Sequence, residues 1–93
     1  MASEKYVLRL YVTGMTPRST RAITAVRAVC EEHLAGQYDL EIIDVYQVPQ
    51  RIKEDQVVAI PTLVKCTPAP PRLLVGDMSN RERLLSGLGL PHD

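Results

Sequence analysis

Residues 57–65 read VVAIPTLVK and place Pro61 inside a run that otherwise has the composition of a buried β-strand. Proline has no backbone N–H to donate to a β-ladder, so it normally divides a strand or confines it to a sheet edge. We therefore expect a strand over Thr62–Cys66, directly after the proline. Residues 56–61 fit either the end of a short helix or the beginning of a strand.

The amino-terminal part of the chain has clear periodic patterns. Tyr6–Val12 alternates with a period of two, which predicts a β-strand. Thr16 is a suitable N-cap, and the proline and spaced aliphatic residues after it predict a helix over Pro17–Leu34, which Gly36 ends with a positive φ. Tyr38–Val45 alternates again. This is a βαβ unit, whose two strands should be parallel.

The carboxyl-terminal part of the chain has less regular secondary-structure patterns. Pro49–Asp55 is polar and favours a short helix, the proline-rich residues 67–71 (TPAPP) predict an extended loop, and Arg72–Val75 predicts a short strand. Residues 79–82 (SNRE) fit an S-x-x-E capping box for a last helix. Two glycines weaken that helix, because each costs about 1 kcal/mol relative to alanine in a helix interior.

Composition narrows the class of protein. The 93 residues predict one small domain over 1–93, and 11 basic residues balance 11 acidic ones, which argues against nucleic acid or an anionic membrane as partner. There is no apolar signal segment and no run long enough to span a bilayer, so we expect a cytoplasmic protein.

The cysteines and histidines do not suggest a metal or a redox centre. Cys30 and Cys66 lie far apart with no C-x-x-C motif, and neither His33 nor His92 stands at metal-ligand spacing from them. We therefore expect no metal, no cofactor and no catalytic residue. Both cysteines are expected to be buried as small apolar side chains.

The predicted order of strand, helix, strand, short helix, strand, strand, helix is similar to the thioredoxin-like fold. In that fold an isoleucine-proline-threonine turn carries a cis-proline that faces the start of the first helix, and residues 59–63 (AIPTL) resemble that turn. The redox motif would lie at residues 16–19, which read TPRS. Hydroxyl groups cannot exchange disulfides, so thioredoxin chemistry is not expected.

Five segments together resemble, in order, the KaiB family of circadian clock proteins: YVLRLYVTGMTPRSTRAI, YDLEIIDV, IPTLVK, TPAPPRLLVGDMSNRE and LSGLGL. The resemblance covers about Tyr6–Leu90. It implies a non-enzymatic α/β protein that binds the N-terminal ring of a KaiC-like hexameric ATPase. It also implies two folds, a thioredoxin-like βαβαββα binding form and a βαββααβ resting form that self-associates as a dimer or tetramer. A KaiA-like protein or a clock-output histidine kinase would be further partners that act on or compete for the same ring.

The resemblance also implies roles for particular residues. Arg21, Lys65 and Arg72 match basic partner-binding positions, and Glu41 lies on the same expected surface, where cyanobacterial relatives tend to carry Lys. A solvated surface charge is the alternative for each. Fold-switch roles are implied for Tyr6, Pro61, Pro70, Gly87 and Gly89. Their alternatives are plain packing, rigid loop residues and an ordinary frayed helix.

The local patterns are consistent with such a switch. A chain with two folds needs segments of weak or conflicting preference, so that two packings differ by a few kcal/mol. Residues 46–93 have that character, whereas residues 6–45 are locally consistent and should be the invariant half. Two other functions stay open: a thioredoxin-like or glutaredoxin-like thiol oxidoreductase, and the sensor domain of a clock-output histidine kinase, which kinase segments would follow.

Overall fold

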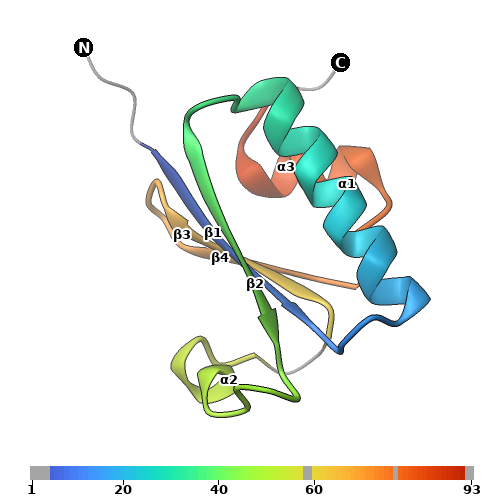
Figure 1. Cartoon of the computed structure of the whole chain (residues 1–93). Helices are drawn as coiled ribbons and strands as arrows, with labels where there is room; N and C mark the ends of the chain where they lie inside the picture. The colour runs from blue at the N-terminus through green and yellow to red at the C-terminus, as the bar shows by residue number, and fades with distance from the viewer. Residues whose placement is uncertain (1–4, 58–59, 77, 92–93) are drawn as a thin grey trace.

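The computed structural model describes residues 5–57, 60–76 and 78–91. Within them the chain forms a mixed α/β domain whose helices lie on both sides of one sheet (Figure 1). The elements are β1 (Tyr6–Val12), α1 (Pro17–His33), β2 (Tyr38–Asp44), α2 (Arg51–Glu54), β3 (Thr62–Thr67), β4 (Arg72–Val75) and α3 (Arg81–Leu88).

The four strands lie in the order β2-β1-β3-β4. β1 and β2 pair in parallel over their whole lengths, as the βαβ pattern predicts. β3 runs antiparallel to β1, and β4 antiparallel to β3. The predicted order βαβαββα is therefore confirmed.

Each face of the sheet has its own apolar cluster. The larger cluster lies between the sheet and helices α1 and α3 and includes Leu8, Leu10 and Leu63. The smaller cluster is centred on Tyr11, Ile43 and Val64. The alternation of β1 explains this division, since successive side chains of a strand point to opposite faces.

The start of α1 follows the sequence prediction. Thr16 is the N-cap, its hydroxyl accepts the backbone N–H of Ser19 at 3.2 Å, and Pro17 is the first helical residue. The helix ends at His33, and Gly36 has the predicted positive φ of +75°. These signals place the first turn of α1 beside the carboxyl end of β1.

Pro61 is buried and immediately precedes β3. The Ile60–Pro61 peptide bond is cis, as the resemblance to the thioredoxin-like fold implies. The peptide bonds before Pro68 and Pro70 are cis as well. Residues 58 and 59, part of the ambiguous segment, lie outside the described residues.

The start of α3 corrects one prediction. The N-cap is Asn80 rather than Ser79, because the Asn80 side-chain oxygen accepts the N–H of Arg83 at 3.1 Å. Asparagine and serine cap helices about equally well, so the adjacent pair left the exact start undecided.

The two glycines of α3 have defined places in this fold. Gly89 is the C-cap in the left-handed region, with φ +72°, where it ends the helix without interrupting it. Gly87 is buried, and a Cβ there would come within 2.1 Å of Cδ2 of Leu74. The missing side chain thus lets α3 lie close to β4.

Candidate functional site

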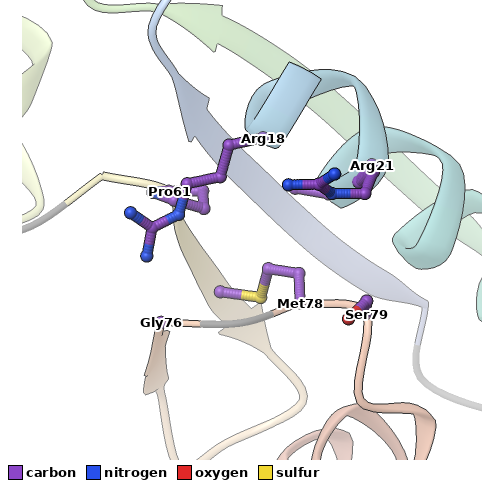
Figure 2. A pocket seen from close by; sticks show the side chains of 7 residues that line it. Arg18, Arg21, Pro61, Gly76, Met78 and Ser79 are labelled. Atoms are coloured by element: carbon purple, nitrogen blue, oxygen red, sulfur yellow. The ribbon is translucent and has the colours of Figure 1, made fainter. Parts of the chain in front are cut away.

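A cavity opens where α1 begins. It measures about 360 Å³ and lies between the first turns of α1, Pro61 and the chain that follows β4. Figure 2 shows Arg18 and Arg21 on one side of it and Met78 and Ser79 on the other. The predicted placement of the cis-proline opposite the start of the first helix is therefore confirmed.

The charge of this cavity is positive on the helix side. Arg18 and Arg21 are exposed, and neither takes part in the ion pairs found among residues 5–57, 60–76 and 78–91. The helix N-terminus adds partial positive charge at the same end. The arrangement suits contact with an acidic group.

Hydroxyl groups occupy the corner where a thioredoxin-like enzyme carries its thiols. Ser19 is 1% exposed, and its Oγ accepts the N–H of Thr13 at 3.1 Å and the hydroxyl of Thr16 at 2.9 Å. These bonds join the end of β1 to the first turn of α1. The hydroxyl groups at this corner cap the start of α1, and no thiol lies among residues 13–19.

Neither cysteine lies at this corner. Cys30 is 0% exposed in the third to fourth turn of α1, and burial raises the pKa of its thiol to about 11. Cys66 is half-buried, so the prediction that both cysteines are buried is wrong for this one. Cys66 lies near the end of β3 at the margin of the smaller cluster, where covering is incomplete.

The four predicted partner-binding residues do not form one cluster. Arg21 lines the cavity, whereas Lys65 and Arg72 are directly opposite each other in the β3–β4 pair. Lys65 is only 5% exposed, which leaves it little surface to offer in this fold, while Arg72 is exposed. Glu41 lies on β2, beside Arg9 of β1. The partner roles of all four stay predictions.

The predicted fold-switch residues are spread along the chain. Tyr6 packs against the larger cluster and donates a hydrogen bond from its hydroxyl to the carbonyl of Leu88, 3.0 Å away at the end of α3. It therefore combines packing with a contact between the two predicted halves. Pro61 is buried, whereas Pro70 is exposed in the β3–β4 loop. Their roles in switching, like those of the two glycines, stay predictions.

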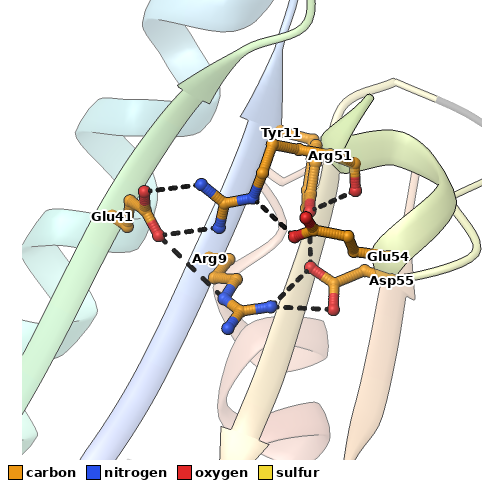
Figure 3. A network of polar contacts seen from close by, with 6 residues as sticks. All are labelled: Arg9, Tyr11, Glu41, Arg51, Glu54 and Asp55. Atoms are coloured by element: carbon orange, nitrogen blue, oxygen red, sulfur yellow. Dashed lines mark hydrogen bonds and ion pairs between the residues drawn. The ribbon is translucent and has the colours of Figure 1, made fainter. Parts of the chain in front are cut away.

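A polar network that the sequence did not reveal lies on the other face, between α2 and the strands (Figure 3). Nη1 of Arg9 bonds both carboxylate oxygens of Asp55, at 3.0 and 3.1 Å. The hydroxyl of Tyr11 reaches the same carboxylate and, at 2.9 Å, the carbonyl of Arg51. Arg51 in turn makes a two-pronged bond with Glu41, at 3.0 and 3.1 Å.

The network affects the protonation of its members. Burial, strengthened by Asp55, raises the pKa of Tyr11 to about 12. The hydrogen bonds from Arg51 lower the pKa of Glu41, and the bond to Asp55 raises the pKa of Arg9. The carboxylate of Glu54 lies 2.9 Å from Nε of Arg51 without the alignment of a hydrogen bond. Alternation predicts that Arg9 and Tyr11 share a face, but nothing in the sequence pairs them with Asp55, which is 44 to 46 residues away.

Two features are absent from the part of the chain that the structure describes. No three His, Cys, Asp or Glu side chains there come close enough together to hold a metal ion. None of the helices described there has the length and apolar character needed to cross a membrane.

Solved structures similar to this chain are thioredoxin-like. The N-terminal domain of Synechococcus elongatus SasA matches with a TM-score of 0.76 and 25% identity, over 96% of this chain and 88% of that domain. Mitochondrial thioredoxin 3 of Saccharomyces cerevisiae matches with a TM-score of 0.73 and 16% identity, over 94% of this chain and 79% of that protein. The second likeness shows the fold alone.

Sequence relatives are closer. The circadian clock oscillator protein KaiB of Prochlorococcus marinus (strain NATL2A) is 46% identical over 92 residues, which cover 99% of this chain and 86% of the relative. The circadian clock protein KaiB3 of Synechocystis sp. (strain PCC 6803) is 46% identical over 90 residues, covering 97% of this chain and 88% of the relative. The KaiB domain family matches residues 9–90. The chain therefore belongs to the KaiB family, whose named relatives are circadian clock proteins with a regulatory role.

Proposed function

We propose that this chain is a non-enzymatic regulator of a circadian or simpler timing system. In its thioredoxin-like form it binds a KaiC-like hexameric ATPase, alters the ATPase or phosphorylation state of that ring, and changes the access of other partners to it. The observation that carries this proposal is a thioredoxin-like domain of the KaiB family whose helix corner holds the buried hydroxyl of Ser19 in place of a thiol.

The carboxyl edge of the parallel strands supports a binding role. β1 and β2 end side by side, and two large apolar residues follow them, Met15 at 87% exposure and Tyr46 at 76%. Large exposed apolar side chains next to positive charge are typical of protein interaction surfaces. We propose that these two residues belong, with Arg18 and Arg21 of the first turns of α1, to the face that meets the ring.

The proposal includes a slow fold switch of residues 46–93, with self-association of the resting form. Several polar contacts hold this half against residues 6–45 and would have to break. They include the Tyr6–Leu88 hydrogen bond and the ion pair between Arg81 and Glu32 at 2.7 Å. Such contacts are individually worth about 1 kcal/mol or less at a surface, so two packings of similar free energy are compatible with them.

The experiment is complex formation in solution. The purified chain is incubated for a day with ATP and the KaiC-like hexamer of its own organism and then passed through a size-exclusion column. We expect a complex that forms over hours and is weakened by Arg21→Ala. Arg27→Ala is the matched control, because Arg27 is also an exposed arginine of α1 but lines a separate surface hollow beside Tyr38. Absence of any complex would contradict the proposal.

A thiol oxidoreductase is the alternative that the thioredoxin-like fold raises. It requires a reactive thiolate near the start of α1, whereas Cys30 is buried with a raised pKa and Cys66 lies on β3. A variant with Cys30→Ser and Cys66→Ser that lost its biological activity while keeping its fold would favour this alternative. We expect the variant to keep full ring binding.

The likeness to the SasA N-terminal domain supports a third candidate function, that of the sensor domain of a clock-output histidine kinase. The identity to KaiB proteins is 46%, against 25% for SasA, and therefore favours the KaiB-like regulator. The length of the gene in its organism separates these two candidates directly.

A further inference from the structure

We propose that Arg9, Tyr11, Glu41, Arg51 and Asp55 form a polar latch that docks α2 on the sheet, and that opening this latch is the first step by which residues 46–57 leave the thioredoxin-like arrangement. The second part rests on the fold switch of the proposed function. The first part concerns only the docking of α2 and can be tested without any partner.

Polar contacts supplement a small apolar attachment of α2 to the sheet. The helix has four residues, far fewer than an isolated helix needs for stability in water, and none of the four is buried. Its apolar attachment comes from Ile52, which is half-buried, from Val57 just beyond it, which is 7% exposed, and from the half-buried Val48 just before it. By contrast, α1 buries five side chains and α3 buries three leucines. α2 thus depends in part on its side-chain bonds to the strands.

Every strong contact of the latch crosses from the predicted invariant half to the predicted switching half. Arg9, Tyr11 and Glu41 belong to β1 and β2, whereas Arg51 and Asp55 belong to α2 and its C-cap. Figure 3 shows the five side chains converging from the two sides. Opening the latch therefore loosens α2 without breaking any hydrogen bond within the βαβ unit.

The partial burial of four of the five latch residues favours their opening together. Tyr11 is 0% exposed, and the side chains of Asp55, Arg51 and Arg9 are 13%, 23% and 31% exposed, whereas that of Glu41, at the outer end of the latch, is 52% exposed. A partly buried polar group that loses one partner while α2 stays docked is left unsatisfied, which costs more than the bond itself contributes. If α2 leaves as a whole, water satisfies both sides. Intermediate arrangements are thus disfavoured, as a two-state element requires.

The test is a double-mutant cycle read by amide hydrogen exchange on the free protein. Glu41→Gln and Arg51→Gln each remove one side of the two-pronged pair, and the double variant removes both. The probes are the amide protons of Ile52 and Val57, which bond the carbonyls of Pro49 and Ile52. We expect each single variant to raise their exchange rates about threefold to tenfold, as about 1 kcal/mol of docking energy implies.

The double variant separates a direct pair from two independent effects. If Glu41 and Arg51 act as one pair, the amides of the double variant exchange as fast as those of a single variant, within about twofold. If the two substitutions act independently, their effects on the exchange rate multiply. Asp39→Asn is the control, because the Lys5–Asp39 pair at 3.1 Å is exposed and lies away from α2. We expect it to leave the exchange of Ile52 and Val57 unchanged.

Three results would overturn the latch. The first is that neither single variant changes the exchange rates of Ile52 and Val57, and the second is that the two effects multiply in the double variant. The third is that the amides of α3 exchange faster by the same factor, which indicates global unfolding. If α2 loosens as expected but amide NMR spectra of the variants show one set of peaks throughout, the latch stands and the slow fold switch of the proposed function fails.

Discussion

Replacing Tyr11 with Phe removes one hydroxyl from the smaller cluster. That hydroxyl has a single hydrogen, shared between the Asp55 carboxylate and the Arg51 carbonyl. A hydrogen bond to a charged group contributes about 1.5–3 kcal/mol, and the ring itself stays in place in the variant. We therefore expect Tyr11→Phe to lower the free energy of unfolding by about 2 kcal/mol at pH 8.

The same hydroxyl predicts a dependence on alkaline pH. The pKa of Tyr11 is raised from 10.0 to about 12 in the folded protein, so its contribution is complete below pH 10 and is lost as pH rises toward 12. The whole loss is on the order of 2 to 3 kcal/mol, and roughly half of it is gone at pH 11. Tyr11→Phe cannot show this loss.

Urea unfolding of both proteins at pH 8, 10 and 11 measures the difference. The advantage of the wild type should be constant from pH 8 to about 9.5 and roughly 1 kcal/mol smaller at pH 11. Absorbance of ionised tyrosine, followed on the same samples, should show one fewer late-titrating group in the variant. An advantage that does not change with pH would refute the assignment of this pKa to the buried hydroxyl.

Three other perturbations have defined outcomes. Because Arg51 lowers the pKa of Glu41, that carboxylate stabilises the fold above its ordinary pKa of 4.5 and the contribution is lost as pH falls further; the stability difference between wild type and Glu41→Gln should shrink toward zero below pH 4.5. Gly89→Ala places a Cβ at φ +72° and should lower the free energy of unfolding, measured by thermal unfolding, by about 1 kcal/mol. Gly89→Asn should lower it less, and equal losses in the two variants would contradict the left-handed cap. A thiol reagent should label Cys66 in the native protein and Cys30 only after unfolding. Labelling of Cys30 before Cys66 would contradict the burial of the Cys30 side chain beneath α1.

Local patterns in the sequence were sufficient for the elements that rest on local interactions. The period of two in Tyr6–Val12 and the cap at Thr16 each determine their own few residues, and both are found as predicted. The start of β3 directly after Pro61 also followed from a local rule, because proline has no N–H to donate to a β-ladder. The resemblance to the thioredoxin-like fold then supplied its orientation toward α1.

Features that depend on distant neighbours were missed. Asp55 meets Arg9 across 46 residues of chain, and no periodic pattern reports such a meeting. The need for glycine at position 87 follows from Leu74 on β4, which the helix pattern of α3 does not contain. Where two good caps are adjacent, as at 79 and 80, the residue types alone do not select one of them.

The central claim is that this chain docks on a KaiC-like ring in its thioredoxin-like form. The most direct measurement is the amide NMR spectrum of isotope-labelled chain bound to the N-terminal ring of its own KaiC-like ATPase. We predict a saturable complex that retains the antiparallel contacts between Leu10 and Leu63 of β1 and β3 and between Leu63 and Leu74 of β3 and β4. Failure to bind, or a bound spectrum in which those strand contacts are absent, would contradict the account.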